Sequence, residues 1–329
     1  MIKEKINWGI LGCGKIAHTF AEGLSFLPYA RLLAVASRSG ERAAGFAKRH
    51  NAERNYADYE SLAVDPDVDV IYIATPHNFH FEHTLLSLDH NKSVLIEKPI
   101  CVNAKETGKL IETARGKQVF LMEAMWTRFL PVIEMIKNWL KDRVLGEVKM
   151  LFADFGFNFP FDAESRIFNP NLAGGALLDL GIYPVYFSTM VFAQFPVDIS
   201  SKAILGKTGI DEQSAYILKY GNGELAMLAS TLKALASQSA TITGTRGSIF
   251  VPEFWKARKA RVTIDGKKSK MVEPDFEGNG YNYEALEVMS CLKRGELESK
   301  SMSLDESLMN MQIMDSIRQQ IGLVYPFEK

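Results

Sequence analysis

Between Ile6 and Met122 the sequence alternates short apolar runs with segments of helical spacing, and this alternation restricts the possible folds more than any other feature. The runs are almost continuous in apolar residues, as expected of strands that helices cover on both faces. Alternating strands and helices are typical of βαβ units and a parallel sheet. The expected strands are 6–11, 31–37, 69–75, 93–97 and 119–123, and the expected helices begin at 15, 41, 79 and 104.

Beyond about residue 150 the pattern changes to longer runs with period-two alternation, at 149–159, 215–220 and 224–231. The dipeptides Asn222-Gly223 and Asp265-Gly266 predict β-hairpins. This part of the chain therefore predicts an α+β domain with a largely antiparallel open sheet. A wide apolar face predicts a C-terminal helix, with Leu308, Met311, Met314, Ile317 and Ile321 three or four residues apart.

The length of 329 residues is about twice that of a usual domain, so we expect two domains. The change of pattern divides them into a dinucleotide-binding Rossmann domain at 1–122 and a substrate-binding and oligomerisation domain at 123–329. The expected class of the whole chain is α/β.

Charge and cysteine content exclude several classes of protein. Lys and Arg total 38 against 39 Asp and Glu, and the net charge of −1 gives no general attraction to nucleic acid or anionic membrane. The three cysteines are far apart and form no metal-binding pair, which suits a reducing cytoplasm. The N-terminal sequence lacks the pattern of a signal peptide. The uncharged stretch Leu180–Val197 contains prolines and polar residues, so it predicts a buried helix and not a membrane span.

A G-x-G-x-x-A motif follows the first expected strand and opens the first expected helix. Gly12 permits the tight turn, Gly14 lets the backbone approach a pyrophosphate, and Ala17 lets the helix lie close to the strand. Lys15 and Ile16 begin the helix whose N-terminus would face the phosphates. This context predicts dinucleotide binding, and the alternative is a glycine-rich turn that binds nothing.

The end of the second strand favours NADP(H) as the cofactor, with NAD as the second choice. An NAD site usually places an acidic residue there, where this chain has Ser37-Arg38-Ser39. A hydroxyl and a guanidinium can bind a 2′-phosphate, which a carboxylate would repel, and Arg42 is close enough in sequence to contribute. The alternative for Arg38 is an ordinary solvated arginine.

The ends of the next two strands supply further candidates, because open parallel sheets bind ligands at the carboxyl ends of their strands. We expect cofactor contacts from Thr75, Pro76, Asn78, His80, Glu97 and Lys98. The spacing of His77, His80 and His83 suggests a metal, but on a helix the outer two lie about 240° apart around the axis. We therefore predict no metal site.

One acid and one phenol lie four residues apart in an otherwise uncharged part of the second domain. Asp179 is the only charged residue between Arg166 and Asp198, and a buried carboxylate needs a partner or a ligand. Together with Tyr183 it is a candidate for the catalytic site. The alternative for Asp179 is a structural cap.

Four motifs, G-x-G-x-x-A, T-P-x-x-x-H, E-K-P and D-x-G-x-Y, occur in this order and resemble those of the glucose-fructose oxidoreductase and inositol dehydrogenase superfamily over essentially the full chain. The segments 122–129, 174–184 and 321–326 resemble more narrowly the branch of dimeric dihydrodiol dehydrogenase and NADP-dependent xylose dehydrogenase. The resemblance implies a Rossmann domain followed by an α/β domain whose open sheet often forms the dimer interface. It also implies that Lys98 is the lysine of E-K-P, that Asp179 is the substrate-side acid, and that Tyr183 stands where most members have histidine.

The 6 histidines all lie within the first 90 residues, so the second domain has no imidazole to move a proton. If the proton donor is in that domain, Tyr183 must serve, with Lys98 lowering the pKa of the phenol and binding the developing alkoxide. Asp179 would orient a neighbouring hydroxyl or Lys98 itself. We expect an NADP(H)-dependent oxidoreductase that transfers a hydride between the nicotinamide and a carbinol or carbonyl of a sugar, polyol or cyclic diol.

Substrate contacts are expected from Trp126, Arg128, Phe157, Arg166 and Asp179, and Asn158 is a further candidate to read hydroxyls. The four phenylalanines at 155, 157, 159 and 161 alternate along one strand and its exit, and they line either a pocket or the core and sheet interface. Aromatic walls with scattered polar groups suit a polyhydroxy ligand.

Two other functions stay open from the sequence. One is a nucleotide-sensing regulatory protein that has kept the fold and lost turnover, and the other is a sugar oxidoreductase that never releases its cofactor. For assembly we expect a homodimer through the sheet of the second domain, with a tetramer as the alternative.

Overall fold

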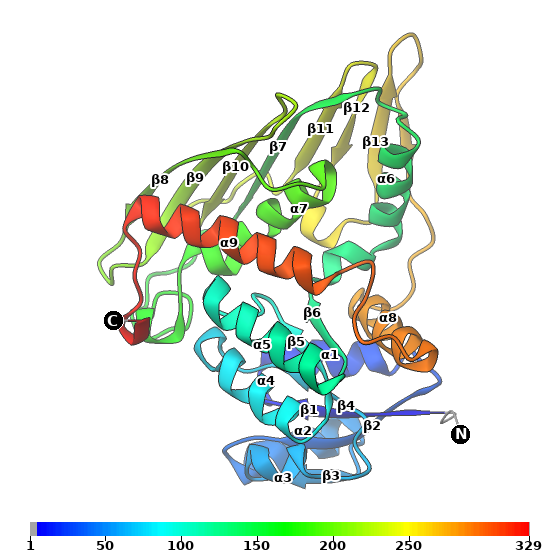
Figure 1. The fold of residues 1–329 in the computed structure, drawn as a ribbon, viewed down its shortest axis with the longest axis vertical. Helices are drawn as coiled ribbons and strands as arrows, with labels where there is room; N and C mark the ends of the chain where they lie inside the picture. The colour runs from blue at the N-terminus through cyan, green and yellow to red at the C-terminus, as the bar shows by residue number, and fades with distance from the viewer. Residues whose placement is uncertain (1–4, 329) are drawn as a thin grey trace. The chain divides into compact units, whose positions relative to one another are not determined.

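The computed structural model describes residues 5–328, which fold as two compact units (Figure 1). The first unit contains the chain up to Phe129 together with Glu277–Leu308. The second contains Leu130–Phe276 together with the chain from Met309. The expected division into 1–122 and 123–329 did not include the return of residues 277–308 to the first unit.

The first unit contains the Rossmann sheet that the sequence predicted. Within the described residues it has six strands in the order β3-β2-β1-β4-β5-β6, and every neighbouring pair is parallel. In such a sheet the strand order reverses between β1 and β4, and ligands bind beyond the carboxyl ends of the strands. The strands are β1 (Ile6–Leu11), β2 (Ala30–Ala36), β3 (Arg54–Tyr56), β4 (Val70–Ile73), β5 (Ser93–Glu97) and β6 (Leu121–Ala124).

Helices join these strands and bury their apolar faces on the sheet. In α1, Phe20 stacks on Tyr72 of β4 with ring centroids 3.7 Å apart and meets the edge of Trp8 of β1 at 5.3 Å. All three side chains are buried, so α1 is held flat against the centre of the sheet. The helices of this unit are α1 (Lys15–Leu24), α2 (Gly40–His50), α3 (Tyr59–Ala63), α4 (His80–Asp89), α5 (Ala104–Lys117) and α8 (Tyr281–Arg294).

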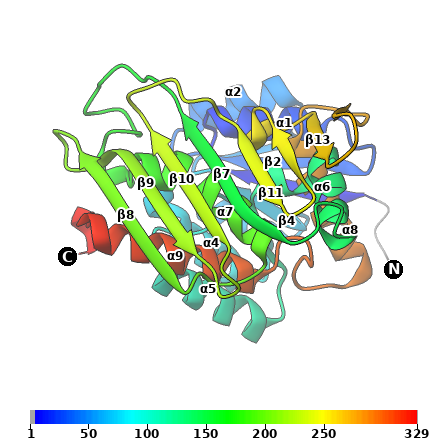
Figure 2. The same ribbon diagram turned by 90° about the horizontal axis from the view of Figure 1, so that it is seen from above.

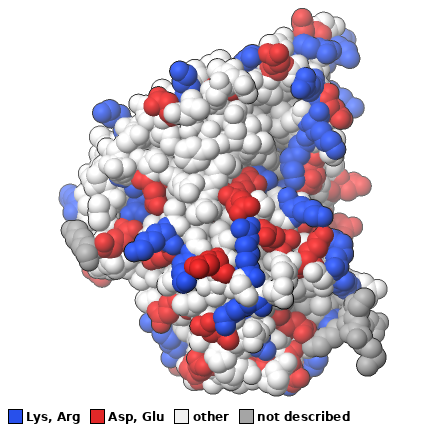
Figure 3. Space-filling model, in the orientation of Figure 1, with Lys and Arg blue, Asp and Glu red and all other residues white. Residues whose placement is uncertain are grey.

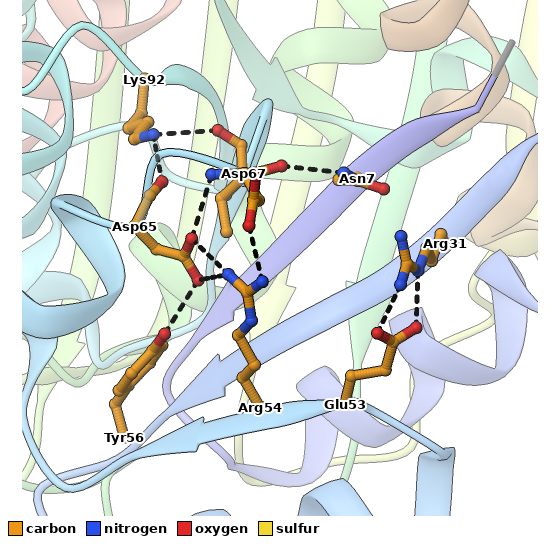
Figure 4. A network of polar contacts seen from close by, with 9 residues as sticks. Asn7, Arg31, Glu53, Arg54, Tyr56, Asp65, Asp67 and Lys92 are labelled. Atoms are coloured by element: carbon orange, nitrogen blue, oxygen red, sulfur yellow. Dashed lines mark hydrogen bonds and ion pairs between the residues drawn. The ribbon is translucent and has the colours of Figure 1, made fainter. Parts of the chain in front are cut away.

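A polar network joins β3 to the segment that leads into β4 (Figure 4). The buried carboxylate of Asp65 accepts hydrogen bonds from Arg54 at 2.7 and 2.9 Å and from the Tyr56 hydroxyl at 2.9 Å. Arg54 also contacts Asp67 at 2.6 Å. The ammonium of Lys92 donates to the carbonyls of Asp65 and Val68. These contacts fasten the short strand β3, which has few apolar side chains of its own.

Asp65→Asn is expected to lower the free energy of unfolding by about 1–3 kcal/mol, because it weakens hydrogen bonds to a charged and buried acceptor. Burial alone would raise the pKa of Asp65, but hydrogen bonds from Arg54, the Asp67 backbone and Tyr56 hold this pKa below its ordinary value of 3.8. The stabilisation is therefore present above that value and disappears as the pH falls through the lowered pKa. Urea unfolding at pH 7 and pH 3 measures both effects.

Asp67→Asn is the matched control, because the side chain of Asp67 is 56% exposed and its ion pair is expected to contribute about 0.5 kcal/mol or less. Equal losses of unfolding free energy for the two variants would contradict the stabilising role of the Asp65 carboxylate. A loss for Asp65→Asn that is the same at pH 3 as at pH 7 would contradict it as well.

The second unit is built on the largely antiparallel sheet that the sequence predicted. Within the described residues its eight strands run in the order β14-β13-β12-β11-β7-β10-β9-β8, and β7 with β10 is the parallel pair. The hairpins predicted at Asn222-Gly223 and Asp265-Gly266 join β9 to β10 and β13 to β14. The strands are β7 (Val148–Gly156), β8 (Asp198–Leu205), β9 (Asp211–Lys219), β10 (Leu225–Thr231), β11 (Ala240–Gly244), β12 (Gly247–Val251), β13 (Ala260–Ile264) and β14 (Lys270–Val272).

Helices cover one face of this sheet, and Figure 2 shows α7 and α9 behind the strands. Burial along β9 alternates, so one side of the strand faces these helices and the other faces outward. The buried helix expected at 180–197 is a π-helical segment at Leu177–Gly181 that continues as α7 (Ile182–Phe192). The stretch Pro170–Phe192 is long and apolar enough to cross a membrane, but 83% of its most apolar window is buried within the structure, as in a core helix. The remaining helices are α6 (Pro131–Lys141) and α9 (Leu304–Ile321).

Candidate functional site

The first turn of the Rossmann unit has the backbone geometry that a dinucleotide needs. Gly12 adopts a φ of +100°, and an added Cβ would lie 2.9 Å from the carbonyl oxygen of Ala74. Beside Gly14 the nearest atom to an added Cβ is 4.0 Å away, so the backbone there can be approached closely. The helix that follows has no acidic side chain in its first turn, and Lys15 is exposed. The turn and the N-terminus of α1 therefore fit a pyrophosphate.

The end of β2 presents two exposed arginines beside small hydroxyl residues. The guanidinium of Arg38 lies 5.6 Å from the centre of the Phe79 ring. Ser37, which precedes Arg38 in the chain, is buried. Ser39 accepts a hydrogen bond from the backbone nitrogen of Arg42 at 3.3 Å and caps α2. Arg38 and Arg42 thus place two positive charges at the end of β2, and Glu41 is the acidic residue in the first turn of α2.

His80 lies between the segments that follow β4 and β5. Its ring is fully buried, with Nε2 2.8 Å from the carbonyl oxygen of Thr75 and Nδ1 2.7 Å from that of Pro99. Burial lowers the pKa of His80 to about 4, so the ring is neutral and donates its one N–H to one carbonyl at a time. His80 is therefore placed to hold two loops together, whereas we had expected a direct cofactor contact.

The other predicted residues at these strand ends are more accessible. Pro76 and Asn78 are half-buried, and the Asn78 Oδ1 atom has no hydrogen-bond partner among residues 5–328. An acceptor left in this way at the carboxyl ends of the strands suits a ligand donor. Lys98 is half-buried, and its backbone nitrogen donates to Glu97 Oε2 at 3.1 Å. Glu97 also accepts from the buried hydroxyl of Tyr72.

Two of the predicted substrate contacts have structural partners within the first unit. Trp126 is 5% exposed and stacks on Tyr281 of α8 with ring centroids 4.6 Å apart. The Arg128 guanidinium is paired with Glu306 and donates to the carbonyl of Ser301 at 2.9 Å. Both residues thus fasten the segment that follows β6, and the ion pair accounts for the charge of Arg128.

In the second unit the predicted acid and phenol occur on consecutive turns. Asp179 lies in the π-helical segment and accepts two hydrogen bonds of 3.0 Å from one nitrogen of Arg166. Tyr183 lies four residues later in α7 and is 7% exposed. π-Helical turns are rare and concentrate at functional sites, so the backbone of this segment also favours a functional role. The Asp179–Arg166 pair supplies the partner that a buried carboxylate requires.

Aromatic rings surround Tyr183. Phe155 of β7 meets the Tyr183 ring edge-on at 5.1 Å and meets Phe157 at 5.4 Å. Trp255 approaches Phe155 at 5.1 Å and Tyr183 at 6.4 Å. The sequence did not single out Trp255, and the available signal was its rarity, since the chain has 4 tryptophans. Phe155 and Phe157 thus form a wall beside the phenol, while Phe161 packs against Phe168.

The structure brings the predicted residues together in two groups. Gly12, Gly14, Arg38 and Lys98 belong to the first unit, and Asp179, Arg166 and Tyr183 belong to the second. Within residues 5–328, no group of three His, Cys, Asp or Glu side chains is arranged to hold a metal ion.

Comparison with known sequences identifies the class of protein that these features define. Residues 6–125 match the family described as "Oxidoreductase family, NAD-binding Rossmann fold", and residues 133–250 match the "GFO/IDH/MocA C-terminal domain". The chain belongs to the GFO/IDH/MocA family of oxidoreductases. It is a dehydrogenase acting on CH–OH donors with a nicotinamide dinucleotide.

Curated relatives match almost the whole chain. A trans-1,2-dihydrobenzene-1,2-diol dehydrogenase of Xenopus tropicalis is 41% identical over an alignment of 331 residues that covers 97% of this chain and 99% of the relative. The protein of the same name from Mus musculus is 36% identical over 335 residues, at 98% and 99% coverage.

Solved structures share the fold at lower identity. An aldose-aldose oxidoreductase from Caulobacter crescentus aligns with a TM-score of 0.89 at 21% identity, covering 96% of this chain and 97% of that one. A levoglucosan dehydrogenase aligns with a TM-score of 0.89 at 19% identity, covering 97% of both chains. These likenesses confirm the two-domain architecture.

Proposed function

We propose that this protein is an NADP(H)-dependent dehydrogenase that oxidises a secondary carbinol of a vicinal diol, either a cyclic dihydrodiol or a sugar. The observation that carries the proposal is Tyr183, a phenol set among aromatic rings one turn after the Asp179–Arg166 pair. The full-length similarity to dihydrodiol dehydrogenases supports an apolar diol as the substrate class. An aromatic wall beside a few polar groups suits such a ring.

Gly12, Gly14, Lys15 and Ile16 are the residues that would hold the pyrophosphate of the dinucleotide. The bound nicotinamide supplies the hydride acceptor when the diol is oxidised. Tyr183 removes the hydroxyl proton of the carbinol, and it returns this proton when the carbonyl is reduced. A phenol with an ordinary pKa of about 10 is a weak base at neutral pH, so it needs a cation nearby.

Lys98 is the proposed cation. Its ammonium stabilises the phenolate form of Tyr183 and donates a hydrogen bond to the developing alkoxide. The ion pair with Arg166 holds the Asp179 carboxylate in place, and this carboxylate orients the second hydroxyl of the diol. Arg166 is itself exposed, with 41% of its side chain accessible, so it also contributes to binding that hydroxyl.

The test is a screen of NADP⁺ and NAD⁺ reduction, followed at 340 nm, with trans-dihydrodiols, aldoses and polyols as donors. We expect turnover with at least one vicinal diol and a preference for NADP⁺. Tight nucleotide binding without turnover on any donor would favour the regulatory alternative. If the purified protein already carries the nucleotide and releases it only on denaturation, the result would favour the oxidoreductase with a non-dissociating cofactor.

Arg38→Ala is expected to raise the dissociation constant for NADP(H) by about tenfold or more, because a charge-assisted contact to the 2′-phosphate is lost. The exposed position of Arg38 above Phe79 supports this role. The dissociation constant for NAD(H) should hardly change, which makes NAD(H) the internal control in the same titration. An equal loss for both nucleotides would mean that Arg38 supports the fold and does not read the phosphate.

We also propose that the second unit forms a homodimer through the outward face of its sheet. Phe152, Met227 and Ile217 of three adjacent strands line one depression in this face, and Phe152 and Ile217 are 43% and 48% exposed. Figure 3 shows a broad area over the second unit that carries few charged side chains. Apolar residues gathered in this way favour contact with a second copy.

Replacing Ile217 with Lys is expected to dissociate the dimer, because the new charge would be buried in a symmetric contact. Light scattering at micromolar concentration should give the mass of two chains for the parent protein and of one for the variant. A parent protein that is monomeric at this concentration would refute the proposed interface. A tetrameric parent protein would require a second interface in addition to this one.

The proposed location is a reducing cytoplasm. Cys13, Cys101 and Cys291 are free thiols in the structure, and two of them are buried.

A further inference from the structure

Asp211 is a buried carboxylate that the proposed chemistry does not use. It opens β9, has an exposed fraction of 0%, and accepts from the backbone nitrogen of Leu177 at 2.8 Å and from the Ser214 hydroxyl at 2.6 Å. Both bonds reach Oδ2. Among residues 5–328, Oδ1 has no hydrogen-bond partner.

The Leu177 nitrogen begins the segment that carries the proposed catalytic residues. Leu177–Gly181 contains Asp179, and it continues without a break into α7, where Tyr183 is the second residue. The first N–H groups of a helical segment have no partner within the helix, and they favour a negative charge. Asp211 therefore caps the catalytic segment from another element of the second unit.

The same carboxylate also lies against the turn that precedes this segment. Gly175 has a φ of +131°, and an added Cβ would lie 2.3 Å from Asp211 Oδ1. The Tyr325 hydroxyl, which would lie 3.5 Å from the same added Cβ, donates to the carbonyl of Gly174 at 2.8 Å. The turn thus contacts both β9 and the C-terminal tail, and its backbone approaches Asp211 as closely as a glycine permits.

Charged and titratable groups of the neighbouring elements face this carboxylate. Arg318 of α9 lowers the pKa of Asp211, although its guanidinium is paired with Glu328 and Asp315. Tyr325 of the tail and Tyr216 of β9 are buried phenols, and burial, together with the smaller effect of the Asp211 carboxylate, raises the pKa of each.

Burial raises the pKa of Asp211 to about 7, against the opposing effect of the hydrogen bonds from Ser214 and Leu177. The raised value means that the charged form predominates above about pH 7 and that the neutral form predominates below it.

We propose that Asp211 is a positioning residue, whose carboxylate anchors the Leu177 end of the catalytic segment and so sets the placement of Asp179 and Tyr183. A charged acceptor holds an N–H about twice as strongly as a neutral one. Protonation of Asp211 therefore loosens residues 174–181 and lowers turnover on the acid side. The effect on turnover rests on the proposed function, but the effect on the segment does not.

Asp211→Asn keeps the size of the side chain and removes its charge. At pH 8 we expect kcat to fall about tenfold while the dissociation constant of NADPH is unchanged. The step near pH 7 that Asp211 contributes should disappear from the kcat profile of the variant, because its amide does not titrate, whereas the rise with pH that belongs to Tyr183 should remain. Ser214→Ala is the matched control: it removes the other donor to Oδ2 and leaves the charge, so the step that Asp211 contributes should remain in its profile.

Hydrogen exchange of the peptide 174–181, read by mass spectrometry, tests the anchor without any assay of activity. After correction for the intrinsic pH dependence of exchange, protection in the parent protein should fall between pH 8 and pH 6. In Asp211→Asn it should be low at both values. A protein that reduces neither NADP⁺ nor NAD⁺ would refute the proposed function, yet the exchange result would still decide the role of Asp211.

Protection that is the same at pH 8 and pH 6 in the parent protein would overturn the inference, whether or not the Asn variant folds. An Asn variant whose kcat profile keeps the step near pH 7 would also overturn the inference.

Discussion

Replacing Tyr183 with phenylalanine is expected to lower kcat by about a hundredfold or more, because the substitution removes the proton donor and acceptor from the proposed reaction. The ring keeps its edge-on contacts with Phe155 and Trp255, so folding and NADPH binding should be unaffected. Steady-state kinetics with a diol found in the screen, together with NADPH titration by fluorescence, measures both quantities.

Tyr186→Phe is the matched control, since Tyr186 lies one turn further along α7 and is buried to a similar degree, with an exposed fraction of 1%. It should retain most of the parent activity. If Tyr183→Phe keeps more than about a tenth of kcat, the phenol serves only in packing, and the proton must move through another group.

Tyr183→His replaces the phenol by a group with an ordinary pKa of about 6.5. Partial activity with an optimum at lower pH would identify position 183 as the titrating group. An optimum that does not move would assign the titration to a different residue.

Replacing Lys98 with methionine is expected to reduce kcat by a comparable factor of about a hundred, because the phenolate would lose the cation that we propose for it. Without that charge the pKa of the phenol rises, so the pH above which diol oxidation accelerates should move upward. A kcat profile over pH 6 to 11 measures this shift. Methionine retains the length and the apolar stem of the lysine, so the surrounding packing should tolerate it.

Lys98→Arg separates charge from shape, since arginine keeps the positive charge and cannot give up its proton. It should recover part of the activity and leave the pH above which diol oxidation accelerates near its original value. Residual activity in Lys98→Met with an unshifted profile would contradict the proposed effect of Lys98 on Tyr183.

The Rossmann unit could be predicted from the sequence because its central strands are apolar on both faces and its helices show clear spacing. β3 could not, because Arg54–Tyr56 is three residues long and is held by polar contacts of Arg54 and Tyr56 with the Asp65 carboxylate. The return of residues 277–308 to the first unit was also missed. It depends on contacts such as Trp126 with Tyr281, and no local pattern encodes a contact between residues so far apart in sequence.

In the candidate site, too, local sequence patterns predicted some residues, whereas contacts between distant parts of the chain could not be predicted. Motif residues such as Gly12 could be identified because turn geometry demands a particular residue type. Arg166 and Asp179 were both expected at the site, yet their pairing is visible only in the folded chain. Arg128 was expected to contact substrate, and its ion pair with Glu306 comes from a helix far along the sequence. Asp211 gave no signal at all, because a single acidic residue at a strand start is common.

In the proposed reaction the protein moves a hydride from a carbinol carbon to a nicotinamide. The direct measurement uses a diol deuterated at the reacting carbon, with mass spectrometry of the reduced nucleotide that is formed. We expect the nucleotide to gain one deuterium and the rate to fall relative to the unlabelled diol when chemistry limits turnover. Reduced nucleotide without deuterium, formed at the same rate from labelled and unlabelled diol, would contradict direct hydride transfer.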